Sequence, residues 1–168
     1  DGITLPIGTK ARHINHNYNY GDEIINQLTK WKELGYFEVL PNIEEISKIA
    51  KWNDSNTGSI EKRARAWLDI NCAHCHNIKG SANNTGLFLD YFQTDKKALG
   101  ILKTPVAAGR GSGDLKYDIF PGNSKESIMI YRFNSTNPAI MMPELGRTMV
   151  HYEGLELIET WINQMSID

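Results

Sequence analysis

The stretch Cys72-Ala73-His74-Cys75-His76 decides how the rest of the chain is interpreted. It has the pattern C-x-x-C-H and holds the only two cysteines of the 168-residue sequence. Two cysteines with this spacing lie one helical turn apart, and each can form a thioether bond to one vinyl group along an edge of a porphyrin. The histidine that follows then lies beneath the ring, where its imidazole can bind the iron. The spacing therefore predicts one covalently bound haem c.

Three other uses of a C-x-x-C pair compete with haem attachment. A zinc site would need further cysteine or histidine ligands, and no second C-x-x-C or H-x-x-x-H pair supplies them. The histidines that zinc could recruit are His13, His16, His74, His76 and His151. A thioredoxin-like dithiol needs a βαβ setting, whereas the surrounding pattern is helix and loop. A disulfide closing so short a loop would remove little entropy from the unfolded chain. Haem attachment is therefore the favoured interpretation.

The composition is that of a soluble globular protein, with 40% hydrophobic and 23% charged residues. The formal net charge is −2 and no basic stripe is present, so we expect no nucleic-acid partner. No apolar run reaches the ~18 residues of a membrane span, and the N-terminus is not a signal peptide. We therefore expect the chain to start after any targeting segment or to be a domain of a longer protein. Because haem is attached covalently on the outer side of the bacterial inner membrane, we expect a periplasmic or otherwise extracytoplasmic location.

Upstream of the motif, the sequence predicts an N-terminal arm and helical extension over residues 1–58. Residues 1–20 are rich in turn formers and predict an irregular arm. Residues 22–34 have apolar side chains at helical spacing, and a second, shorter helix is expected after them. Polar residues 53–59 are typical of a linker. We expect this extension to pack on a haem domain formed by residues 59–168.

A helix that begins after Ser59 leads into the motif, because Ser59 can cap it and apolar residues recur at helical spacing up to Asn71. After His76 the chain is loop-like, with an apolar run over 87–92 that fits either a short strand or a buried extended segment. Farther on, Arg110 stands among small residues. We interpret its guanidinium as a partner for a haem propionate, with an ordinary surface arginine as the alternative.

Two helices are expected in the last third of the chain. One follows Pro121-Gly122, with Asn123 as its cap, and ends near Asn134. The other runs from about His151 to Met165 with a stripe of apolar residues. Together with the helix that precedes the motif, they predict an all-α fold in which the haem supplies much of the core.

Between these two helices lies Met141-Met142-Pro143, which is a candidate source of the distal iron ligand. A thioether is a soft ligand suited to haem iron. Consecutive side chains of an extended segment point to opposite sides, so only one methionine can face the iron. We choose Met142, because Pro143 restricts its backbone to the extended region. Met141 is the first alternative, and the histidines outside the motif are the next.

Several segments of the chain carry a resemblance to a known family. They are Tyr20-Gly21 with Asn26-Gln27-Leu28, Arg63 to His76, Thr104 to Gly111, Pro121-Gly122, Met141 to Arg147 and His151 to Ile162. Residues 60–168 resemble a class I cytochrome c domain. More narrowly, the chain is similar to the C-terminal haem domain of a family of bacterial extracytoplasmic c-type cytochromes, several of which have further haem motifs upstream.

The resemblance implies Cys72 and Cys75 as thioether links, His76 as the proximal iron ligand and Met142 as the distal one. The fold that it implies is a cytochrome c-like haem domain. The chain departs from the multihaem members because it has no second haem motif. Any multihaem role therefore belongs to a longer parent chain or to a partner.

The sequence thus predicts a monohaem c-type cytochrome with His/Met-ligated haem that exchanges single electrons with a partner protein. We expect an electron carrier rather than an enzyme, because iron with both axial positions filled binds no substrate. The alternatives are a peroxidase-like haem enzyme and a redox- or gas-sensing module, each with an open sixth iron position. Fold alone does not separate these functions.

Overall fold

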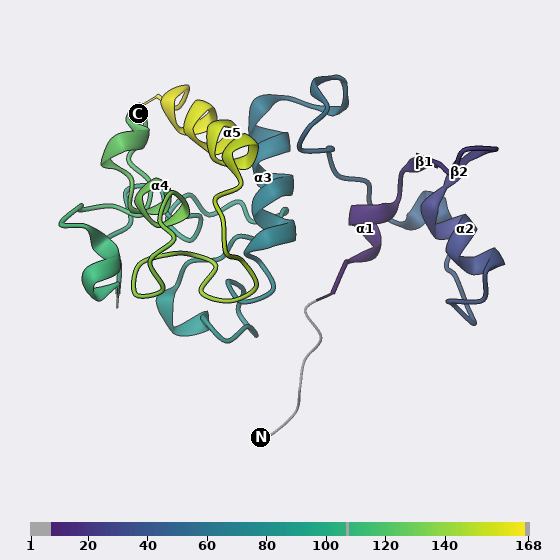
Figure 1. Ribbon diagram of the computed structural model, residues 1–168, viewed down its shortest axis with the longest axis horizontal. Helices are drawn as coiled ribbons and strands as arrows, with labels where there is room; N and C mark the ends of the chain where they lie inside the picture. The colour runs from purple at the N-terminus through teal and green to yellow at the C-terminus, as the bar shows by residue number, and fades with distance from the viewer. Residues whose placement is uncertain (1–7, 107, 167–168) are drawn as a thin grey trace. The chain divides into compact units, whose positions relative to one another are not determined.

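The structure is a computed structural model that describes residues 8–106 and 108–166. The chain divides into two compact units, one that extends to Ala50 and one that starts at Lys51 (Figure 1). Polar residues 51–58 are thereby grouped with the segment that carries the C-x-x-C-H motif. Among the residues described, no helix is both long enough and apolar enough to cross a membrane.

The first unit combines short helices with a small sheet. Strand β1 (Asn17–Asn19) pairs with β2 (Ile24–Asn26) in antiparallel fashion, and Tyr18 lies opposite Ile25. The helical elements of this unit are α1 (Ala11–Ile14), α2 (Gln27–Glu33) and the 3₁₀ helix η1 (Ile43–Glu45).

The all-α prediction is wrong, because Ile24–Asn26 form a strand where the apolar spacing predicts one helix over residues 22–34. Adjacent β-branched isoleucines favour a strand, and pairing with β1 decides between the two possibilities. The helix begins only at Gln27, where the side chain of Asn26 accepts the N–H of Leu28 at 2.9 Å. The protein is therefore a mixed structure of helices and a two-stranded sheet.

A buried asparagine holds the first unit together. The side-chain amide of Asn15 donates to the carbonyls of Ile43 (3.2 Å) and Ile46 (2.7 Å), and its Oδ1 accepts from Asn26 Nδ2 at 2.8 Å. Asn15 has no exposed surface, so these bonds satisfy a polar group that would otherwise be costly to bury. The second, shorter helix expected from the sequence is here a single 3₁₀ turn, η1.

The described part of the second unit contains three α-helices joined by long loops and short 3₁₀ turns. Helices α3 and α5 lie side by side (Figure 1). Isolated parallel bridges join Ile101 to Ile119 and Tyr117 to Ser127. The elements are η2 (Ser55–Thr57), α3 (Ile60–Asn71), η3 (Asn83–Thr85), η4 (Gly109–Ser112), η5 (Ser124–Glu126), α4 (Ile128–Phe133) and α5 (Tyr152–Asn163).

Two of the predicted helices are confirmed in this unit and one is not. Helix α3 begins after Ser59, whose Oγ accepts the N–H of Lys62 at 3.3 Å, and α5 spans most of the predicted last helix. The helix expected to start at Asn123 is split into η5 and the shorter α4. Asn123 makes no side-chain capping bond, while the hydroxyl of Ser127 accepts the N–H of Phe120 at 2.9 Å and interrupts the segment.

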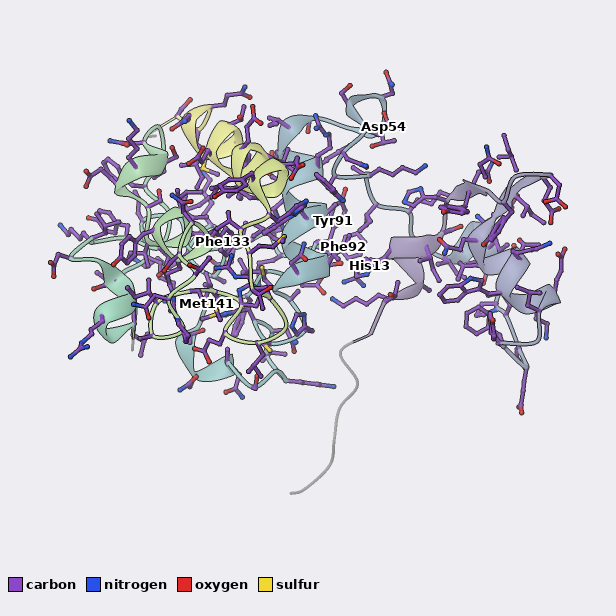
Figure 2. All side chains as sticks on the ribbon, in the orientation of Figure 1. His13, Asp54, Tyr91, Phe92, Phe133 and Met141 are labelled. Carbon is purple, nitrogen blue, oxygen red and sulfur yellow. The ribbon has the colours of Figure 1, made fainter. Side chains whose placement is uncertain are left out.

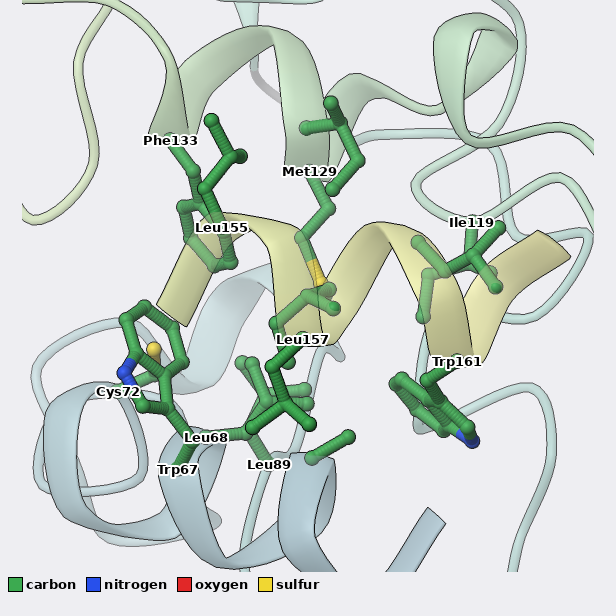
Figure 3. Packing of buried hydrophobic residues seen from close by; sticks show 14 of the residues in the cluster. Trp67, Leu68, Cys72, Leu89, Ile119, Met129, Phe133, Leu155, Leu157 and Trp161 are labelled. Atoms are coloured by element: carbon green, nitrogen blue, oxygen red, sulfur yellow. The ribbon is translucent and has the colours of Figure 1, made fainter. Parts of the chain in front are cut away.

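The apolar core of the second unit lies where α3, α4 and α5 converge (Figure 3). Their facing side chains are almost completely buried, and Cys72 of the motif belongs to the same cluster. Partly buried residues, Met142 among them, pack against its edge. The cluster comprises Ala64, Trp67, Leu68, Cys72, Ala73, Leu89, Ile119, Met129, Ile130, Phe133, Val150, Leu155, Leu157, Ile158, Trp161 and Ile162. The motif is thus anchored directly on the core.

Candidate functional site

The C-x-x-C-H motif folds as consecutive tight turns at the C-terminal end of α3. The N–H of Cys72 still bonds to the carbonyl of Leu68 (2.8 Å), as in a helix. The carbonyl of Cys72 then accepts the N–H groups of Cys75 (3.1 Å) and His76 (2.9 Å). The two thiols are not joined by a disulfide. One short turn therefore presents both sulfurs and the imidazole of His76.

The loop after the motif closes tightly against it. The side-chain amide of Asn77 donates to the carbonyl of Ala73 at 2.6 Å, and the N–H of Ala82 donates to that of Cys75 at 3.1 Å. A Cβ atom at Gly80 would lie 2.0 Å from the carbonyl oxygen of Cys75, which leaves no room for any side chain. Glycine is therefore required here for close packing, a role that periodicity in the sequence does not reveal.

His76 is buried, with 7% of its surface exposed. Burial is the largest influence on its pKa and lowers it; Arg132 and His74 also lower the pKa, whereas the Leu87 backbone and Glu144 raise it. A neutral imidazole is the form that binds a metal ion. The Nδ1 atom is buried and makes no well-formed hydrogen bond to any described residue. His76 is thus prepared as a neutral ligand by its surroundings.

Cys72 does not have the character of a redox-active thiol. Burial, with Cys75 and Asp69 adding to it, raises the pKa of Cys72 to about 12. Catalytic C-x-x-C pairs instead have a cysteine whose pKa is lowered by a positive environment. The thiol of Cys72 therefore stays protonated near neutral pH, in keeping with an anchoring role.

The zinc interpretation finds no ligand set in the part of the chain that the structure describes. No group of three or more histidine, cysteine or carboxylate side chains is arranged there to hold a metal ion. His151, the most distant candidate in the sequence, is engaged elsewhere: its Nδ1 accepts the indole N–H of Trp67 at 3.0 Å. His13 accepts the backbone N–H of Lys10 at 3.2 Å.

The two adjacent methionines occupy different environments. Met141 is buried with 8% exposure but lies outside the core cluster, whereas Met142 is half-buried and packs against the cluster that contains Cys72. Figure 2 labels Met141 in the second unit, together with Phe133 at the end of α4. The backbone forms bends from residue 142 to 146 rather than a regular extended stretch. The expected alternation of an extended segment is therefore replaced by a local bend.

Electrostatics link this loop to the motif. Glu144, two residues after Met142, is among the groups that act on the pKa of His76. The same carboxylate lies 3.9 Å from Arg132 on α4, and Arg132 also acts on His76. The charges of two residues that are distant from the motif in the sequence therefore act on the pKa of His76.

Arg132 is a site residue that pattern reasoning missed. Its Nε–H donates to the carbonyl of Ile140 at 2.9 Å, and its own carbonyl accepts the N–H of Met142 at 3.2 Å. Burial lowers the pKa of its guanidinium. The only signal of this role in the sequence is that an arginine stands within a short apolar helix. An arginine that faces the core needs partners for its charge.

The loop around Arg110 is packed against the rest of the unit, whereas the side chain of Arg110 is not. Arg110 is exposed on η4, and its guanidinium has no hydrogen bond or ion pair with any residue in the ranges described. The neighbouring Gly111 is buried against Arg132, and a Cβ atom at Gly111 would lie 3.0 Å from Arg132 Cζ. The small residues around Arg110 therefore have a packing role. Arg110 stays a candidate partner for a haem propionate, and only its position in the sequence supports this assignment.

No family model, no curated protein and no solved structure matches this chain. The resemblance to c-type cytochromes thus stays a prediction from its sequence motifs.

Proposed function

We propose that the protein is a monohaem c-type cytochrome that carries one haem c and transfers single electrons outside the cytoplasm. The observation that carries the proposal is the turn after α3, where two unbridged cysteines stand beside a buried histidine of lowered pKa. Cys72 and Cys75 would hold the haem through thioether bonds, and His76 would be the proximal ligand. The C-x-x-C-H spacing supports this assignment independently.

The residues around the motif fit a haem. The buried imidazole of His76 and the half-buried thioether of Met142 are a donor set of the nitrogen and thioether type that low-spin haem iron takes. Haem would supply the one-electron iron couple. The chain's own contribution would be to anchor the ring through Cys72 and Cys75, to offer His76 and Met142 as axial ligands, and to exclude water with the apolar cluster. A filled sixth position favours electron transfer over substrate chemistry.

An electron carrier needs a redox partner, which we propose to be another extracytoplasmic protein or a further domain of a longer, multihaem chain. The location follows from covalent haem attachment. Arg110 stays our candidate partner for a haem propionate, because an exposed guanidinium near small residues can form a bidentate pair with a carboxylate.

Acidified organic solvent tests the covalent bond. Extraction of the denatured wild-type protein should leave the haem on the polypeptide, whereas the double variant Cys72→Ala, Cys75→Ala should release or never acquire it. Single variants should retain the haem through one thioether bond. Haem that leaves the wild-type chain with the solvent would show that the proposal is wrong. A reversible one-electron titration of the intact protein then tests its role as a carrier.

A further inference from the structure

The loop from residue 134 to 149 carries both methionines and is fastened by an arginine at its far end. The guanidinium of Arg147 donates to the carbonyls of Arg132 (3.2 Å), Phe133 (3.0 Å) and Ser135. These carbonyls lie at the C-terminal end of α4, where helical carbonyls lack partners within the helix. Arg147 therefore caps α4 and closes the loop onto it.

Arg132 fastens the same loop near its middle. Its Nε–H bonds to the carbonyl of Ile140 (2.9 Å), its carbonyl accepts the N–H of Met142 (3.2 Å), and its Nη2 lies 3.9 Å from Glu144. One residue of α4 thus bonds to the backbone of Ile140 and Met142 and lies close to the carboxylate of Glu144. Gly111 packs closely against this guanidinium.

We infer that Arg147 and Arg132 are positioning residues that keep the loop closed and hold Met142 toward His76. The inference rests on the proposed function, because it concerns the distal iron ligand. Its physical basis is that bends, rather than a regular extended backbone, surround Met142. Restriction by Pro143 alone therefore does not hold the side chain in place, and the hydrogen bonds from the two guanidinium groups do.

The chain offers a matched control for the loss of such an arginine. Arg65 is 8% exposed, and its Nη2 donates to the carbonyls of Asp90 (3.1 Å), Tyr91 (2.8 Å) and Gln93 (2.6 Å). The chemistry is the same as that of Arg147, but it fastens a different loop. Replacing either arginine by glutamine should destabilise the fold, whereas only the change at Arg147 should affect the loop of Met142.

The experiment compares Arg147→Gln and Arg65→Gln in the haem-loaded protein. The readouts are the weak far-red charge-transfer band of methionine-ligated ferric haem and the rate at which carbon monoxide binds the reduced form. We expect Arg147→Gln to weaken the band and to bind carbon monoxide roughly tenfold faster than wild type, because the charged hydrogen bonds that hold the loop on α4 are lost. Arg147→Lys should give values between those of wild type and Arg147→Gln, since lysine keeps the charge but replaces the planar fork of five donors with a compact ammonium group. Arg65→Gln should keep the wild-type band and rate.

Equal band intensity and equal carbon monoxide rates in the two glutamine variants would overturn the inference while leaving the proposed function intact. A wild-type protein that binds haem covalently but lacks the band would overturn the distal ligand and, with it, the inference. If Arg147→Gln fails to fold, Arg132→Lys replaces it: this change keeps the charge but removes the Nε–H bond to Ile140. It should then give the faster carbon monoxide binding, and a wild-type rate would contradict the inference.

Discussion

His74 and His76 belong to the same turn but have different surroundings. His76 is buried and its pKa is lowered chiefly by burial, whereas His74 is only half-buried. Only His76 follows the second cysteine, the position from which an imidazole reaches the iron. We therefore expect His76→Ala to abolish the low-spin haem spectrum and His74→Ala to retain it. Absorption spectra of the two purified variants make the comparison, and an equal loss in both would refute the assignment of His76.

The two methionines should likewise separate by substitution. Met142→Ala should open the iron to carbon monoxide, lower the reduction potential and create peroxidase-like activity. Met141→Ala should keep the ligation but lower the free energy of unfolding by about 2 to 3 kcal/mol, because Met141 is buried. Carbon monoxide titration and urea unfolding measure the two effects. If the variant at Met141 is the one that gains carbon monoxide binding, the ligand is Met141.

At the scale of the elements, the contact between α3 and α5 depends on one glycine. Gly154 lies in the first turn of α5, and a Cβ atom there would be 2.3 Å from Trp67 Nε1 and 2.6 Å from His151 Nδ1. The two groups are joined by a hydrogen bond of 3.0 Å, and the ring of Trp52 packs against His151 with a centroid distance of 4.8 Å. The close approach of the two helices therefore requires a residue without a side chain.

We expect Gly154→Ala to lower the free energy of unfolding by about 1 to 2 kcal/mol. Overpacking of a rigid indole costs about 1 to 3 kcal/mol and exceeds the gain of up to ~1 kcal/mol in helix propensity. Gly8→Ala is the control, since no atom of the described residues lies within 4 Å of a Cβ atom built there. Chemical denaturation of both variants provides the measurement. A variant at Gly154 as stable as wild type would show that the helices can separate without cost.

At the scale of the whole molecule, one buried ion pair should influence how stability varies with pH. Lys103 Nζ lies 3.2 Å from Asp118 Oδ2, and their side chains are 9% and 10% exposed. Burial raises the pKa of Asp118 above its ordinary 3.8, against the opposing effect of Lys103. Removal of one partner from a buried pair typically costs about 3 to 5 kcal/mol, because the other charge stays buried alone.

Lys103→Met should therefore destabilise the protein by about 3 kcal/mol at neutral pH, and by less in acid. Without the lysine the pKa of Asp118 rises further, so the folded protein holds this proton more tightly than the unfolded chain does. The variant then loses stability as the pH rises above 3.8. The difference in its free energy of unfolding from wild type is smallest below that pH. Urea unfolding at pH 3.5 and pH 7 measures the difference. An equal loss of stability at both pH values would contradict this explanation. The double variant Lys103→Met, Asp118→Leu should recover most of the stability that Lys103→Met loses.

Local sequence alone was enough to predict some of the elements that matter for the site. Ser59 marks the start of α3, the apolar stripe marks α5, and the C-x-x-C-H spacing identifies the candidate attachment turn. These features depend on residues within one or two turns of each other, and neighbours along the chain determine them. For the same reason, the haem assignment is the part of the functional prediction that needs no tertiary information.

Only the tertiary structure decided that residues 24–26 form a strand, that Met142 rather than Met141 contacts the core cluster, and that Arg147 fastens the loop onto α4. Each outcome depends on partners far away in the sequence. The apolar spacing at Ile24 fits both helix and strand until β1 pairs with it. A half-buried guanidinium such as that of Arg147 has no periodic signal, because its partners are backbone carbonyls whose positions exist only once the chain has folded.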